Sequence, residues 1–201
     1  KLDGFQESGR WHIDNHWEFR SGFEIHTGTN LVKEGVIEVF EISDSVFVSA
    51  GTYDDQEIQI MIMTNQAKPI SFSSMNRIGG FFGGDRINMT PTLKIRYKDK
   101  ITSEFSFNFN KVNLPSGNFT TNLLRARLTY SFTPKMYIQS LLQYNNQSDQ
   151  WSMNWRFIWQ RSAGTGLYLV YNQAQDYDGI PIEKSTKSFV VKYSYLFDAL
   201  N

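Results

Sequence analysis

The chain has 201 residues, enough for one domain with a sizeable core, and its 20 Lys and Arg balance 20 Asp and Glu. Zero net charge disfavours a nucleic-acid partner, and the absence of cysteine excludes disulfides, cysteine-based zinc sites and thiol catalysis. No stretch approaches the ~18 consecutive apolar residues of a transmembrane helix, yet 15% of the residues are aromatic at a mean hydropathy of -0.41.

Apolar and polar residues alternate along most of the chain, which predicts β-strands and no helix. The pattern is clearest from Trp151 to Trp159, where every second residue is aromatic or Met and the residues between are mostly polar. About eleven strands are expected, at residues 9–20, 23–32, 56–64, 69–76, 89–98, 101–110, 120–132, 135–145, 151–160, 167–173 and 187–197.

The connections between these strands alternate in length. Short turns are expected at one end of the sheet, because glycine and proline stand between closely spaced strands. Long loops are expected at the other end, at residues 33–55, 77–88, 111–119, 146–150 and 174–186.

The apolar side of the strands has two interpretations. In a soluble β-sandwich or lipocalin-like barrel it faces a shared core, whereas in a membrane barrel it faces lipid. The expected strands exceed the ~5–6 residues usual in soluble proteins and reach the ~9–11 that span a bilayer. The sequence therefore favours an antiparallel up-and-down transmembrane β-barrel over residues 1–201, with no second domain.

The two sides of the strands predict two sets of residues. Aromatic and aliphatic residues, many near strand ends as in interfacial girdles, are expected to face lipid. This set contains Trp11, Trp17, Phe107, Leu128, Tyr130, Trp151, Trp155, Trp159, Tyr195 and Phe197. Charged residues on the opposite side are expected to face a lumen, either as a solvated, mutually paired wall or as a selectivity wall for anionic or hydroxyl-rich solutes. This set contains Lys94, Arg96, Arg125, Arg127, Arg156, Asp14, Glu18 and Glu104.

An odd number of strands predicts that more of the barrel precedes this chain. Bacterial single-chain barrels have an even strand number, and their last strand ends in the periplasm. We therefore expect the C-terminal part of a larger barrel, the alternative being a complete barrel with one strand miscounted.

Several short stretches support this interpretation, the longest being VNLPSGNFTTNLLR at residues 112–125. The others lie at 40–42, 50–53, 83–86, 130–135, 142–146, 167–172 and 191–197. In this order they resemble a family of Bacteroidota-type outer-membrane proteins, in which an N-terminal domain similar to family-nine carbohydrate-binding modules precedes a long barrel. The resemblance implies a Gram-negative outer membrane and the end of a longer protein whose N-terminal domain is missing here, and it supports a glycan ligand only weakly. The expected partners are outer-membrane lipid and, for a scaffold, other envelope proteins. It carries no catalytic residues or cofactors to this chain.

Two groups of residues could carry chemistry. His12, Asp14 and His16 share one side of a strand and could approach a metal together with His26 on the next strand, but a polar wall is the favoured interpretation. Acidic residues in expected outer loops could serve a protease or a calcium site, but solvated loop acids are favoured. These are Asp44, Asp54, Asp55 and Asp85. The glycine-rich segment at 79–86 opens no helix, so we expect an external loop or bulge rather than a phosphate site.

The sequence thus predicts no catalytic residues and no metal or other cofactor. The favoured function is a pore or a transport and docking component for a polar solute such as an oligosaccharide. The alternative is a non-catalytic membrane anchor or scaffold subunit of an envelope complex. An outer-membrane enzyme ranks third, because no nucleophile and base can be placed together.

Overall fold

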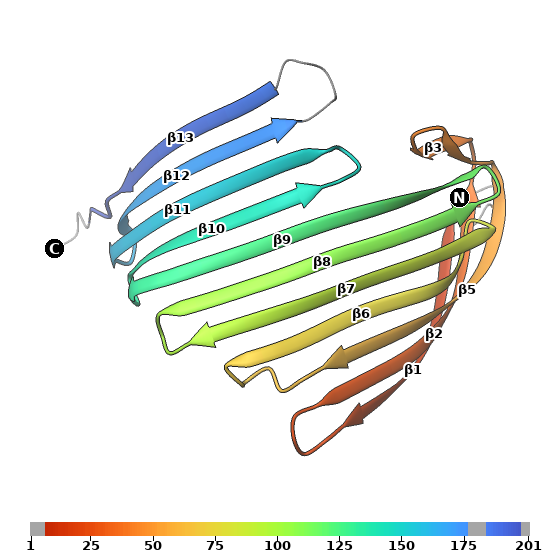
Figure 1. The fold of residues 1–201 in the computed structure, drawn as a ribbon, viewed down its shortest axis with the longest axis horizontal. Helices are drawn as coiled ribbons and strands as arrows, with labels where there is room; N and C mark the ends of the chain where they lie inside the picture. The colour runs from red at the N-terminus through yellow and green to blue at the C-terminus, as the bar shows by residue number, and fades with distance from the viewer. Residues whose placement is uncertain (1–6, 177–183, 198–201) are drawn as a thin grey trace. The chain divides into compact units, whose positions relative to one another are not determined.

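The structure, a computed structural model, describes residues 7–176 and 184–197, and it is all-β (Figure 1). The long strands are β1 (Ser8–Glu18), β2 (Glu24–Val36), β5 (Gly51–Met63), β6 (Ile70–Phe81), β7 (Gly84–Tyr97), β8 (Ile101–Leu114), β9 (Gly117–Thr133), β10 (Met136–Asn145), β11 (Gln150–Ser162), β12 (Thr165–Asp176) and β13 (Lys184–Ser194). They form one antiparallel sheet in the order β1-β2-β5-β6-β7-β8-β9-β10-β11-β12-β13. A separate hairpin pairs β3 (Phe40–Ser43) with β4 (Val46–Val48).

The expected all-β antiparallel architecture, with eleven long strands, is confirmed. Two of the expected long loops are wrong, because β6 and β7 leave only Phe82 and Gly83 between them, and β8 and β9 leave only Pro115 and Ser116. The strands extend beyond the segments in which apolar and polar residues alternate. Their ends contain glycine, or apolar residues on the side that is otherwise polar, and both interrupt the alternation. Phe82 and Gly83 both have positive φ, 49° and 74°, as a type I′ hairpin turn requires.

Other boundaries also differ from the expectation. The expected loop at 33–55 contains the ends of β2 and β5 and the whole β3–β4 hairpin. The expected last strand is too long at its end, because β13 stops at Ser194 and leaves Tyr195 and Phe197 beyond it. In the expected loop at 174–186, β12 continues to Asp176 and β13 begins at Lys184, while residues 177–183 lie outside the described residues.

The chain divides into two compact units. The first comprises Lys1–Thr92 and Phe107–Asn122, and the second comprises Leu93–Ser106 and Leu123–Asn201. The first unit therefore holds β1 to β6 with adjoining parts of β7, β8 and β9, and the second holds the remaining strands. No helix in the described part of the chain is long and apolar enough to cross a membrane.

Strand register separates apolar from polar side chains in the first unit. Because successive residues point to opposite faces, partners in register share a face. One row across β1, β2, β5 and β6 consists of Ile13, Thr29, Ile58 and Ile78. The neighbouring row on the other face consists of His12, Asn30, Glu57 and Gly79.

The second unit shows the same separation. An apolar face carries the row Leu128, Ser140, Trp155, Tyr171 and Phe189. The adjacent row on the opposite face is Thr129, Gln139, Arg156, Val170 and Val190. In both units, one sheet therefore presents an apolar face and a mixed polar face.

A small apolar cluster covers part of the polar face in the first unit. Val46 and Val48 of β4 pack with Val112 and Leu114 of β8, and all four are buried. Val112 and Leu114 have the same parity as Asn108, whose side-chain amide bonds the Thr90 hydroxyl on the polar face. Two hydrogen bonds hold the hairpin there, because the Ser116 hydroxyl accepts from the Phe47 amide at 3.1 Å and donates to the Phe47 carbonyl at 2.6 Å.

Outside this cluster, large apolar side chains are exposed. In the part of the chain that the structure describes, the four cluster residues are the only buried hydrophobic ones. Trp11 is 78% exposed, and exposed aromatic or aliphatic side chains recur on the apolar face in both units. The fold therefore leaves a broad apolar face without any protein cover among the described residues.

The hairpin cluster predicts an unequal response of two adjacent residues in β8. Leu114→Ala removes buried methyl groups, so it should lower the free energy of unfolding by about 2 kcal/mol. Asn113→Ala changes an exposed side chain and should change it by less than about 0.5 kcal/mol. Urea unfolding followed by tryptophan fluorescence measures both, and equal losses would show that the cluster does not secure the hairpin.

Candidate functional site

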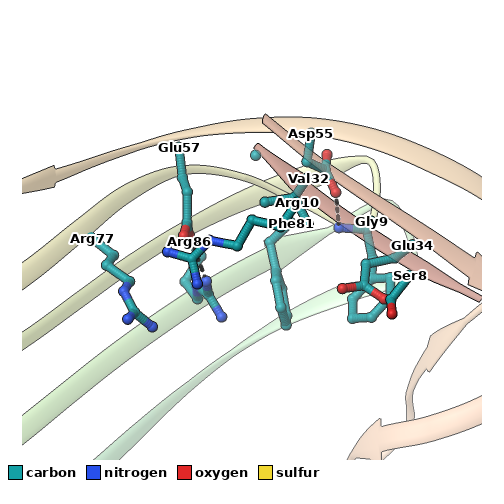
Figure 2. A pocket seen from close by; sticks show the side chains of 12 residues that line it. Ser8, Gly9, Arg10, Val32, Glu34, Asp55, Glu57, Arg77, Phe81 and Arg86 are labelled. Atoms are coloured by element: carbon teal, nitrogen blue, oxygen red, sulfur yellow. Dashed lines mark hydrogen bonds and ion pairs between the residues drawn. The ribbon is translucent and has the colours of Figure 1, made fainter. Parts of the chain in front are cut away.

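A cavity of about 360 Å³ lies within the first unit, beside the hairpin cluster (Figure 2). Six charged side chains line it, three of each sign, together with two aromatic residues next to the β6–β7 turn. These lining residues are Arg10, Arg77, Arg86, Glu34, Asp55, Glu57, Phe81 and Phe82.

Strand register explains why these side chains meet. Arg10 pairs with Val32, and Val32 pairs with Asp55, so one row of the polar face crosses β1, β2 and β5. The next row contains Asn30 and Glu57. Side chains on the same face of adjacent strands approach to about 4.5–5.5 Å between their Cβ atoms, which brings long charged groups into contact.

Glu57 is the most buried charged group of the site, with 5% of its surface exposed. One carboxylate oxygen pairs with Arg86 Nη2 at 2.7 Å, and the other accepts a hydrogen bond from Asn30 Nδ2 at 2.8 Å. A buried carboxylate is tolerated only with such compensation. Arg86 and Asn30 therefore hold a negative charge at the base of the cavity.

Asn30 also anchors Arg10. Its side-chain oxygen accepts from Arg10 Nε at 3.0 Å and from Arg10 Nη2 at 2.7 Å, and it lies 2.6 Å from His12 Nδ1. On the far side, Arg77 Nε donates to Gln59 Oε1 at 3.2 Å. Arg10 and Arg77 are thus positioned by neutral amide oxygens, and within the described residues neither guanidinium has an ion pair with a carboxylate.

Asp55 has a structural role at the edge of the cavity. Its carboxylate accepts hydrogen bonds from the backbone amides of Phe82 at 2.8 Å and Gly83 at 3.4 Å. A bulky residue such as Phe82 rarely adopts positive φ, so the carboxylate helps to hold the turn in this conformation. The Phe82 ring packs edge-on against Tyr53 with ring centroids 5.4 Å apart.

The Arg86 side chain also contacts an aromatic ring and carries a buried donor without a partner in the described part of the chain. Its guanidinium lies over the Phe81 ring, 4.3 Å from the ring centroid, in a cation–π arrangement. Its Nε is buried and has no hydrogen-bond partner among the residues that the structure describes. The cavity therefore contains one donor that the protein itself leaves unused.

The charged residues expected to face a lumen lie on strands. Register places Arg125, Arg127 and Arg156 on one face of the second unit. Arg127 Nη1 lies 3.7 Å from Glu104 Oε1, and Arg156 Nε donates to Asn154 Oδ1 at 2.7 Å. The other members of the set also belong to strands, Asp14 and Glu18 to β1 and Lys94 and Arg96 to β7. That this face lines a lumen stays a prediction.

Every member of the expected lipid-facing set is exposed. Leu128 and Trp155 share a row of the apolar face, and the buried hydroxyl of Ser140 between them has no hydrogen-bond partner among the described residues. Contact of this face with lipid stays a prediction.

The candidate metal ligands lie on β1 and β2, where their side chains contact one another. The His16 and His26 rings stack with centroids 4.0 Å apart, and Asp14 Oδ2 lies 2.5 Å from His16 Nε2. A search of the described residues finds no group of three or more His, Asp and Glu placed to hold a metal ion.

The acidic residues expected in outer loops lie partly elsewhere. Asp54 and Asp55 belong to β5 and Asp85 belongs to β7, and Asp54 lies 3.5 Å from Lys33 Nζ. The glycine-rich segment is likewise the end of β6, a tight turn and the start of β7, rather than an external loop.

Sequence reasoning missed the cavity residues Arg10, Asn30, Glu57, Arg77 and Arg86. A signal for three of them exists, because Arg10, Asn30 and Glu57 occupy the polar side of β1, β2 and β5. Arg77 and Arg86 fall within residues 77–88, for which the sequence predicts a loop. The alternation therefore does not indicate that their side chains lie on the polar face.

Comparison of the chain with models of protein families, with curated proteins and with solved structures finds no match. The resemblance to a carbohydrate-linked outer-membrane family therefore stays a prediction.

The ion pair at the base of the cavity predicts a large stability effect. Glu57→Gln leaves the Arg86 charge without its counter-ion in a partly buried position, so the free energy of unfolding should fall by about 3 kcal/mol. The double variant Glu57→Gln, Arg86→Met removes both charges and should recover part of this loss.

The matched control is Glu34→Gln, which removes a less buried carboxylate from the same cavity and should cost less than about 0.5 kcal/mol. Urea titration measures all three variants. A loss for Glu57→Gln no larger than that for Glu34→Gln would contradict a structural role for the ion pair.

Proposed function

We propose that this chain is an outer-membrane β-barrel protein of a Gram-negative bacterium and acts as a pore or docking component for a polar solute such as an oligosaccharide. The observation that carries the proposal is the division of one long-stranded antiparallel sheet into an exposed apolar face and a polar, charged face. A membrane barrel has the same division, with its apolar face toward lipid and its polar face toward a lumen.

The exposed apolar face supports a lipid partner. Soluble monomers rarely expose contiguous apolar patches above a few hundred Å². Here exposed Trp, Phe, Tyr, Ile and Leu side chains recur on strands of both units, while the buried apolar residues among those described form a single four-residue cluster. Lipid would remove this face from water without any second layer of protein.

Strand length agrees with a membrane span. The long strands contain 10 to 17 residues, and a tilted strand needs about 9–11 to cross the hydrocarbon core. Backbone amides and carbonyls at an open sheet edge cannot be satisfied in lipid. The proposal therefore requires that β1 and β13 each pair with a further strand, either with each other or with strands of a larger barrel.

The polar face supports contact with a polar solute. It carries ion pairs, such as Arg127 with Glu104, and asparagine side chains, such as Asn88 and Asn108, that could bond hydroxyl groups. The β3–β4 hairpin lies on this same face in the first unit and would narrow a lumen there. A narrowed, charged passage favours selective docking over free diffusion.

The hairpin cluster also favours a second function, a non-catalytic membrane anchor or scaffold. Apolar packing of Val46 and Val48 on the polar face occupies space that an open pore would leave to water. A barrel filled in this way would hold partner proteins at the membrane without passing solute. Conductance separates the two functions.

Reconstituted protein should give stepwise ion conductance across planar lipid bilayers, because the charged face would line a water-filled path. Removing the hairpin by joining Val36 to Gly51 with a short glycine linker should raise the single-channel conductance. Protein that inserts, as shown by protection from protease, but stays silent with and without the hairpin would exclude the pore and favour the anchor.

Which face contacts lipid can be tested by substituting adjacent residues on β8 and on β9. Phe107 and Leu128 are each 39% exposed on the apolar face, so Phe107→Arg and Leu128→Arg should each cost about 2–4 kcal/mol in a bilayer if they lie near its midplane.

The neighbouring substitutions Ser106→Arg and Thr129→Arg place the same charge on the polar face and should cost less than about 1 kcal/mol. Reversible unfolding in phospholipid vesicles measures all four. Equal costs on both faces would rule out lipid contact for the apolar face.

A further inference from the structure

We propose that the cavity between β1, β2, β5, β6 and β7 binds an acidic sugar, with Arg10, Arg77 and Arg86 receiving its carboxylate or phosphate group. The cavity is separate from the charged residues that the sequence analysis assigns to a lumen. The inference deepens the proposed function, and it rests on that function only for how the solute reaches the site.

The charged side chains of the cavity differ in whether they have an ionic partner. Glu57 neutralises Arg86, and Asp55 is occupied by the amides of the β6–β7 turn. Arg10 and Arg77 are held by the side-chain oxygens of Asn30 and Gln59, which carry no charge. The six charges of the cavity balance, but among the described residues neither Arg10 nor Arg77 is paired with a carboxylate, so both guanidinium groups can receive an anionic ligand.

These guanidinium groups are held in place before any ligand arrives. Arg10 is fixed by two hydrogen bonds to the fully buried Asn30, and Arg77 by one to Gln59. Ordered side chains lose little further entropy on binding. The planar N–H groups of arginine match the oxygens of carboxylate and phosphate, and the buried Arg86 Nε is a donor still without a partner among the described residues.

The opposite side of the cavity differs in charge and suits hydroxyl groups. Figure 2 shows Arg77, Arg86 and Glu57 together at one side of Phe81, with Glu34 and Asp55 toward the other. The Glu34 carboxylate can accept hydrogen bonds from the hydroxyls of a sugar whose acidic group lies among the arginines.

The size of the cavity limits the ligand. A volume of about 360 Å³ lies at the lower end of the ~300–1,000 Å³ typical of small-molecule sites. One sugar ring with its acidic group fits this volume better than a long chain does. The site therefore predicts recognition of a single acidic unit, either free or at the end of a saccharide.

The test is isothermal titration calorimetry on the purified chain folded in detergent micelles. Glucuronate carries a carboxylate, glucose 6-phosphate carries a phosphate, and glucose and inorganic phosphate are the two controls. We expect one of the acidic sugars to bind at least tenfold more tightly than glucose and more tightly than inorganic phosphate. Which acidic sugar binds more tightly identifies the anionic group.

Substitutions that remove a positive or a negative charge from the cavity should change the affinity in opposite directions, which tests whether the sugar binds there. Arg77→Gln and Arg10→Gln each remove a charge-assisted hydrogen bond and should weaken binding about tenfold. Glu34→Gln keeps an acceptor oxygen for the sugar hydroxyls but removes a charge that repels the anionic group, so it should strengthen binding by up to about fivefold. Lys33→Gln is the matched control, because Lys33 alternates with the cavity-lining Val32 and Glu34 and pairs with Asp54 instead.

Circular dichroism verifies that each variant is folded. Glucose binding as tightly as the acidic sugars, or Arg77→Gln and Arg10→Gln retaining full affinity in folded protein, would overturn the proposal. Inorganic phosphate binding as tightly as glucose 6-phosphate would overturn its sugar part. The measurement requires no conductance, so its failure is distinguishable from failure of the proposed pore.

Discussion

The alternation of side chains along extended backbone is the constraint on which this structure depends. Continuous pairing in register carries the alternation from strand to strand, so that Ile13, Ile58 and Ile78 share one face while His12, Asn30 and Glu57 share the other. A slip of one residue between β2 and β5 would bring Ile58 onto the face of Asn30 and leave Glu57 on the apolar face. Register therefore determines both the lipid-like surface and the cavity.

Burial on the polar face is achieved in two different ways. Near the β3–β4 hairpin, Val112 and Leu114 make the face locally apolar, and the hairpin covers it with valines. Beside that cluster, Glu57 is buried with its charge kept, through Arg86 and Asn30. Phe81 and Phe82 border both regions, since they pack against the cluster and also line the cavity. The hairpin thus supports Phe81 and Phe82, two side chains that line the cavity, without lining it itself.

Regular alternation made the central segments of the strands predictable, as at Trp151 to Trp159, because a single period is visible over nine residues. The strand ends were not predictable from that period. Val112 and Leu114 are apolar on the polar side, and Gly79, Gly80, Gly83 and Gly84 contribute no side chain to either side. The cavity was missed for the same reason, because Arg86 is positioned by β7, which begins at the last of these glycines, Gly84. The partner of Asp55, a pair of turn amides, has no sequence signature at all.

The contact between the β3–β4 hairpin and β8 also has a consequence for the order in which the strands assemble. Phe47 and Ser116, which exchange hydrogen bonds, are separated by 69 residues, and β5, β6, β7 and β8 lie between them in the chain. The hairpin cannot take its place until β8 has been added to the sheet, because β8 supplies Val112 and Leu114. Contacts between such distant segments form slowly, since a long loop must close first. We therefore expect the polar face to stay open while the first strands pair, and the hairpin to close over it late in folding.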